Sequence, residues 1–192
     1  MKENSMRGKG LFSLLYLISP LVIIGILYHA DPDRYSEKIF LAGMILGACA
    51  YSWLVLEIVL IARIRLWERY FGQDFLYRIH AIAGIICVIL VIGHKVLEEH
   101  EVGETDVGSI GGMALIIFGM ITLFAAFFFS NLLTSVIRHI IRFRRLMERN
   151  RFGRYETQVV IHNAVLAGVV VMFIHVMRTS NAEESIAVKA VY

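Results

Sequence analysis

The sequence predicts an all-α membrane protein, a bundle of five transmembrane helices with a sixth begun at its C-terminal end. Three observations favour this fold class. The 192-residue chain is 58% hydrophobic, against roughly 45–50% in soluble domains, and its mean hydropathy is +0.68. The apolar residues fall into long runs with few charges, and the chain has only two prolines. No stretch between the runs is long enough for a soluble domain, so we expect one domain over residues 1–192.

The first three runs have about the 20 residues that an apolar helix needs to cross the hydrocarbon core of a bilayer. Residues 11–28 follow three basic residues, as in a signal peptide, but the run is too long for one and lacks a suitable cleavage site. We therefore expect a retained helix. The run at residues 39–62 contains a single charged residue, Glu57, and the run at residues 75–96 is charged only towards its two ends.

The remaining two runs contain no Asp, Glu, Lys or Arg. They cover residues 110–133 and 157–177 and give the fourth and fifth expected spans. After a short polar stretch, residues 186–192 become apolar again. This segment is either an exposed tail or, as we expect, the first turn of a sixth span of which the rest is missing.

The charges between the spans alternate in sign. The N-terminal tail and the second loop are basic, and the fourth loop carries seven arginines between residues 138 and 154. The first and third loops are rich in Asp and Glu. Because Lys and Arg in short loops mark the cytoplasmic side, we expect a multi-pass protein of the cell membrane with a cytoplasmic N-terminus. Spans one, three and five then run outward.

Four histidines lie inside these spans, where an ionisable side chain is costly and is by default a functional hypothesis. His80 and His94 are about 14 residues apart on the third span, roughly 21 Å of helix, and point about 40° apart. His162 and His175 are about 13 residues apart on the fifth, roughly 19.5 Å, but point about 140° apart on an ideal helix. The heights match, so His80 can pair with His162 near the inner face, and His94 with His175 near the outer face. The fifth span would need local 3₁₀ tightening, a bend, or ligands approached from different sides.

Paired imidazoles in a membrane fit the iron of a b-type haem. Two neutral histidines fill both axial positions, and this closed site favours electron transfer. No CxxCH motif exists, so the haem would be bound non-covalently. We therefore expect two haems b stacked between spans three and five, the inner one on His80 and His162 and the outer one on His94 and His175. The second nitrogen of each ring should donate to a backbone carbonyl or a similar acceptor.

Other polar residues near the histidines have two interpretations. Arg78 and Lys95 are candidates for binding the haem propionates, or are interfacial anchors. Glu57 is expected to pair with Arg63 or another inner arginine. Small residues beside the ligands admit a porphyrin or serve helix packing; they are Ala81, Ala83, Gly84, Gly93, Ala164, Ala167 and Gly168. The remaining histidines, His29, His100 and His139, are expected at the surface, and no residue is assigned a catalytic role.

The pattern His80-x13-His94 with His162-x12-His175, and the segment from Arg154 to His162 (RYETQVVIH), resembles the transmembrane domain of ferric reductases and NADPH oxidases. The resemblance implies an oxidoreductase with six helices and two b haems. Electrons would pass from cytoplasmic NAD(P)H through FAD to the inner haem, the outer haem and an external acceptor, either ferric iron or oxygen. The flavin and nicotinamide domains of that family are not in this chain, so a missing C-terminal part or a partner would supply them.

Two alternatives remain open at this point. The chain could be a haem-binding membrane subunit that delivers electrons to a periplasmic reductase, such as a methionine sulfoxide reductase. It could instead be a non-redox membrane protein, either a metal transporter or a structural bundle whose histidines hydrogen-bond between helices. The partners expected in the main hypothesis are haem, the lipid bilayer, a cytoplasmic flavin-containing donor and the external acceptor, with no nucleic acid.

Overall fold

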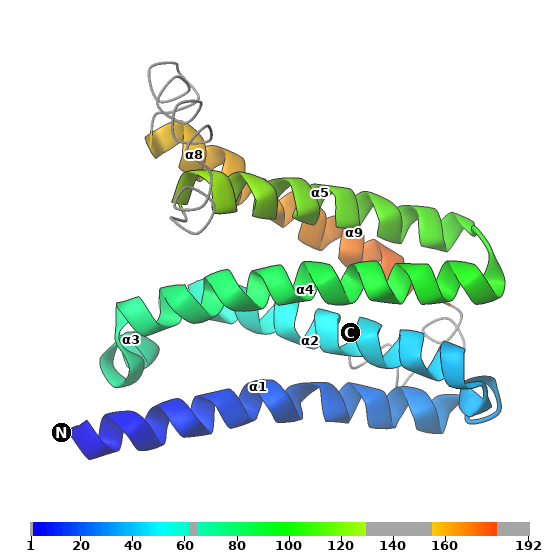
Figure 1. Cartoon of the computed structure of the whole chain (residues 1–192), viewed down its shortest axis with the longest axis horizontal. Coiled ribbons are helices and arrows are strands. Elements are labelled where there is room, and N and C mark those ends of the chain that lie inside the picture. The colour runs from blue at the N-terminus through cyan, green and yellow to red at the C-terminus, as the bar shows by residue number, and fades with distance from the viewer. Residues whose placement is uncertain (1, 62–64, 130–154, 180–192) are drawn as a thin grey trace. The chain divides into compact units, whose positions relative to one another are not determined.

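The computed structural model describes residues 2–61, 65–129 and 155–179, and these residues are almost entirely helical (Figure 1). Five helices are long and apolar enough to cross a membrane. This finding confirms the predicted all-helical fold and the five apolar helices of membrane-spanning length, which are consistent with a membrane bundle. The end of the fourth predicted span and the segment at residues 186–192 lie outside the described residues. The five candidate spans are Phe12–Ala30, Lys38–Leu60, Gln73–Val102, Asp106–Phe128 and Glu156–Met177.

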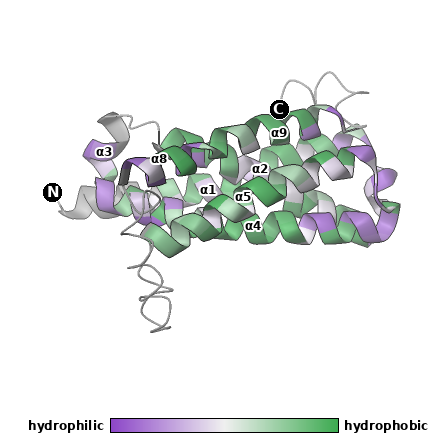
Figure 2. Cartoon of the chain, turned by 90° about the horizontal axis from the view of Figure 1, so that it is seen from above, coloured by the Kyte–Doolittle hydropathy of each residue, from purple (hydrophilic) through white to green (hydrophobic). Residues whose placement is uncertain are grey.

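The chain divides into two compact units. Among the described residues, the first comprises residues 2–61, 65–108 and 176–179, and the second comprises residues 109–129 and 155–175. The expectation of a single domain stays a prediction. In both units the hydrophobic residues occupy the middle of the helices and the hydrophilic residues gather near their ends (Figure 2), as expected of helices that cross a bilayer.

In the first unit, α2 (Lys38–Ile61) packs along α4 (Gln73–Val102), and α1 (Lys2–Ala30) packs against α2 (Figure 1). The short helices η1 (Arg34–Ser36) and α3 (Arg65–Phe71) lie between them in sequence. Gly72 directly precedes α4 and Gly103 directly follows it, and they adopt φ values of 77° and 76°. Residues with a Cβ rarely adopt such values, so these glycines set where the histidine-bearing helix begins and ends.

Two apolar clusters hold the first unit together. One joins α1, η1 and α2, and the other joins α1, α2 and α4. In the second cluster, the ring of Phe12 lies 5.2 Å from that of Tyr16 and 5.0 Å from that of Phe71. The buried members are Ile23, Leu27, Tyr35, Met44 and Ala48 in the first cluster, and Phe12, Tyr16, Leu60, Leu76 and Ala83 in the second.

A proline inside α1 adds a polar link between α1 and α2. Pro20 has no backbone N–H, so the carbonyl of Tyr16, four residues earlier, lacks its usual helical donor. The indole Nε1 of Trp53 on α2 donates to this carbonyl at 2.8 Å, and the hydroxyl of Ser19 donates to it at 3.2 Å. The Tyr16 carbonyl, which lacks a helical donor because of Pro20, therefore accepts a hydrogen bond from a side chain of the neighbouring helix α2.

The second unit contains most of α5 (Asp106–Phe129), all of α8 (Tyr155–Asn163) and most of α9 (Val165–Met177). The fifth predicted span is therefore two helices, interrupted at Ala164. Around the interruption, the N–H of Ala164 donates to the carbonyl of Ile161 at 3.1 Å, and the N–H of Ala167 donates to that of Ala164 at 3.0 Å. Both bonds join residues three apart, which is the tighter 3₁₀ pattern.

Candidate functional site

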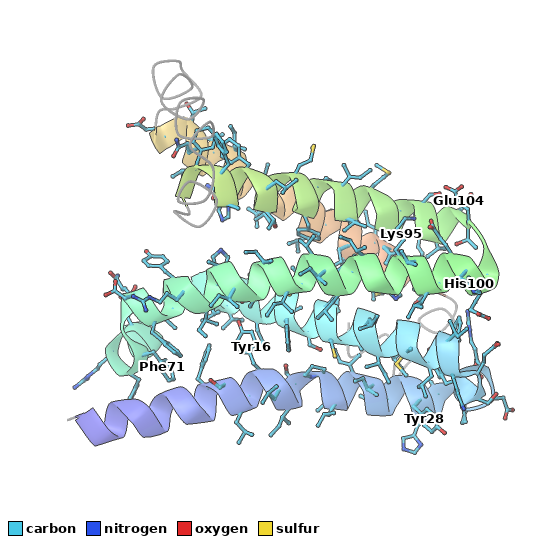
Figure 3. The ribbon with its side chains drawn as sticks, in the orientation of Figure 1. Tyr16, Tyr28, Phe71, Lys95, His100 and Glu104 are labelled. Carbon is cyan, nitrogen blue, oxygen red and sulfur yellow. The ribbon has the colours of Figure 1, made fainter. Side chains whose placement is uncertain are left out.

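His80 on α4 belongs to a buried polar network that spans three helices. Its Nδ1 contacts a carboxylate oxygen of Glu57 on α2, and the hydroxyl of Tyr16 on α1 donates to the other oxygen at 2.7 Å. Figure 3 shows Tyr16 between α1 and α2. Only 5% of Glu57 is exposed. A buried carboxylate is costly unless donors surround it, and here both of its oxygens are engaged.

The pairing expected for Glu57 stays a prediction, because Arg63 and the seven arginines between residues 138 and 154 lie outside the described residues. Among the residues that the structure describes, the carboxylate contacts His80 and Tyr16. The position of Glu57 as the only charged residue of its predicted span was the available signal, because a lone carboxylate in lipid needs a nearby donor.

His94 on the same helix has a different acceptor. Its Nδ1 lies 2.9 Å from the backbone carbonyl of Gly43 on α2, the type of second-nitrogen partner expected of a ligating histidine. Its Nε2 lies 3.2 Å from a carboxylate oxygen of Glu98, one turn further along α4. A Cβ at Gly47 would stand only 3.0 Å from Nδ1 of His94. A glycine there lets α2 approach the imidazole, a role that sequence analysis missed.

The acceptors on α2 repeat the spacing of the histidines on α4. Glu57 and Gly43 are separated by the same number of positions as His80 and His94, and the two helices pack against each other. Because this separation is just under a whole number of helical turns, both rings reach the same neighbour, α2. A neutral imidazole that donates from Nδ1 carries its lone pair on Nε2, the nitrogen that would then bind a metal.

His162 and His175 belong to the second unit. His162 is half-buried in the last turn of α8, two residues before the interruption. His175 lies in the last turn of α9, and a Cβ at Gly111 of α5 would stand 2.8 Å from its ring. A glycine again permits close packing on an imidazole. The pairing of His80 with His162 and of His94 with His175 joins the two units and stays a prediction.

The remaining sequence assignments divide as follows. Arg78 is exposed, and Lys95 pairs with Glu99 on the next turn of α4, so their contact with propionates stays a prediction. Gly93 packs against Leu46, and Gly168 packs against α5, which favours the helix-packing interpretation for both.

The other histidines and metal-binding side chains were also located. His29 and His100 are exposed as expected, with His100 at the C-terminal end of α4 (Figure 3), and His139 lies outside the described residues. Within the described ranges, no three His, Cys, Asp or Glu side chains gather to hold a metal ion.

No family model, curated protein or solved structure matches this chain. The resemblance to ferric reductases and NADPH oxidases therefore stays a prediction that depends on the histidine spacing and the RYETQVVIH segment. What can be said of function comes from the residues themselves.

Proposed function

We propose that this protein carries electrons across a membrane through two bis-histidine b haems. The supporting observation is that both histidines of α4 direct Nδ1 to an acceptor on α2, a carboxylate for His80 and a backbone carbonyl for His94. Such partners orient ligating histidines and fix their tautomer. Histidines that only bridged helices would not need to use the same ring nitrogen at the same spacing.

The residues present fit haem as the resident group. Each haem needs two neutral imidazoles, and His162 and His175 would supply the second ligand at the inner and outer site. A haem held by two histidines supplies a reversible one-electron centre. Glu57 and the Gly43 carbonyl hold the α4 rings through Nδ1, which would leave Nε2 of each ring for the iron.

The proposed direction of electron flow is from the cytoplasm outward. A flavin-containing donor that uses NAD(P)H would deliver electrons to the site at His80, and ferric iron or oxygen would receive them beyond His94. The free energy of an electron falls by about 2.3 kcal/mol per 100 mV of membrane potential when it leaves an inside-negative cell. The field therefore favours the outward step.

The first test is the absorbance spectrum of the purified chain. Reduced-minus-oxidised spectra should show b-type bands with about two haems per chain. His94→Ala and His175→Ala should each remove the outer haem and keep the inner one, because each deletes one ligand of the same pair. His29→Ala and His100→Ala are the matched controls, since both rings are exposed, and they should leave the spectrum unchanged. Protein that stays colourless after reconstitution with hemin would contradict the proposal.

A second measurement identifies the acceptor. Membranes that contain the chain are reduced chemically and then exposed to a ferric chelate or to oxygen, and the rate of haem reoxidation is followed optically. Faster reoxidation by one of them, lost in His94→Ala, assigns that acceptor. If neither reacts, the direct acceptor in the proposal is wrong, and delivery to a separate periplasmic reductase becomes the function to test.

A further inference from the structure

The two histidines of α4 use the same ring atom for bonds of different electrical character. Nδ1 of His80 contacts the carboxylate of Glu57, whereas Nδ1 of His94 contacts the uncharged carbonyl of Gly43. Both acceptors come from α2, and both histidines lie on one face of α4. The main difference between the two environments is therefore a side-chain carboxylate behind one imidazole and a backbone carbonyl behind the other.

The charge of Glu57 is well shielded from solvent. Its side chain is 7% exposed, and the hydroxyl of Tyr16 holds its second oxygen at 2.7 Å. Tyr16 is itself fixed by the indole of Trp53, which donates to its backbone carbonyl. In a surrounding of low polarity, a charge acts more strongly on its neighbours than it does beside water. Glu57 is therefore placed to influence the electronic state of the His80 ring.

A carboxylate also lies close to His94, but its position differs. Glu98 contacts Nε2 rather than Nδ1, and its side chain is 38% exposed. A haem iron bound through Nε2 would take the place of this contact, so Glu98 would turn away from the nitrogen. Solvent weakens the influence of an exposed charge. Of the two carboxylates, Glu57 is the one that can act through the ring from behind a ligating nitrogen.

We propose that Glu57 is a positioning residue that makes the site at His80 the lower in reduction potential of the two. This inference rests on the proposed function. A carboxylate that accepts the Nδ1 hydrogen increases electron donation by the imidazole, which stabilises ferric over ferrous iron. With a haem held at each histidine, one electron would pass from the haem at His80, which would be oxidised, to the haem at His94, which would be reduced. No bond forms or breaks in this step, and no proton is required.

The experiment is an optical redox titration of the purified full-length chain. The wild-type protein should titrate in two one-electron steps. His94→Ala, which keeps the site at His80, should retain the lower step. Glu57→Gln should shift the lower step upward by at least tenfold in the ferric-to-ferrous ratio at fixed ambient potential, which is about 59 mV for one electron. The upper step should stay in place.

Two matched variants separate charge from packing. Glu57→Asp keeps the charge. The potential of its lower step should therefore differ less from the wild-type value than the potential of the lower step in Glu57→Gln does. Glu98→Gln removes the exposed carboxylate and should shift neither step by as much. The inference is wrong if His94→Ala retains the upper step, or if Glu57→Gln moves neither step. If Glu57→Gln fails to bind haem, the assignment from His94→Ala alone decides the inference. A chain with no haem at all would instead contradict the proposed function.

Discussion

The third and fifth spans each carry two histidines as ligand candidates, but one span is a continuous helix and the other is interrupted. Helix α4 (30 residues) runs without interruption, and both of its histidines reach α2. The histidines of the fifth span lie one position closer together in sequence, and that span is interrupted at Ala164, directly after the turn that holds His162. The longer spacing of α4 needs no distortion of the helix, whereas the shorter spacing of the fifth span does.

The interruption acts in the direction that corrects the spacing. On an ideal helix, the shorter spacing leaves the two side chains about 140° apart, short of a whole number of turns. Each residue wound in the 3₁₀ pattern adds about 20° relative to the α-helix. The two bonds at Ala164 and Ala167 therefore bring His162 and His175 closer to one face, although they account for only part of the difference. The sequence left open a local 3₁₀ tightening, a bend, or ligands approached from different sides. Of these, the local 3₁₀ tightening is present.

The largest effect should come from exchanging the two spacings. Deleting Ile89, an exposed residue of α4, gives His80 and His94 the shorter spacing of the fifth span in a helix with no interruption. The rings would then point about 140° apart, and we expect the chain to fall from about two haems to about one. Haem content per chain, measured by pyridine haemochrome, checks this.

The reciprocal change is one alanine inserted between Asn163 and Ala164. It gives the fifth span the longer spacing of α4, which a continuous helix accommodates with both rings about 40° apart. We therefore expect this variant to keep both haems. Retention of both haems by the deletion, or their loss in the insertion, would show that the spacing does not set the geometry.

A smaller effect is expected at the two glycines that pack on histidine rings. An added Cβ would stand 2.8 Å from the His175 ring at Gly111, and 3.0 Å from His94 at Gly47. We expect Gly111→Ala to destabilise the fold by about 1–3 kcal/mol through overpacking, and Gly47→Ala to cost less. Thermal unfolding in detergent measures both. Gly25→Ala is the control, because nothing lies within 4 Å of that position; it should stabilise α1 by up to about 1 kcal/mol.

The smallest effect concerns the link between α1 and α2. Trp53→Phe removes the indole donor to the Tyr16 carbonyl and should cost about 1 kcal/mol of unfolding free energy. In a Pro20→Ala background, the new N–H of residue 20 can bond the same carbonyl, so the cost of Trp53→Phe should shrink. Unfolding of the two single variants and the double variant gives the coupling. Strict additivity would mean that the indole bond does not depend on the proline.

Hydropathy was sufficient to predict the five spans, because bilayer thickness dictates the length of an apolar helix. The common face of His80 and His94 also followed from sequence, since their separation is close to a whole number of helical turns. Three features depended on tertiary contacts that no periodicity contains. They are the choice of Glu57 as the partner of His80, the glycines that face the rings of His94 and His175, and the location of the interruption at Ala164.

Pro20 has a consequence for the order in which the helices assemble. Hydrocarbon offers no water to a backbone carbonyl, so the acceptor that the proline leaves at Tyr16 needs a donor as soon as α1 enters the bilayer. The Ser19 hydroxyl, in the same helix, can serve while α1 is alone, and the indole of Trp53 adds a shorter bond when α2 arrives. We therefore expect α1 and α2 to insert as a hairpin whose Tyr16 and Glu57 are already in place when α4 brings in His80.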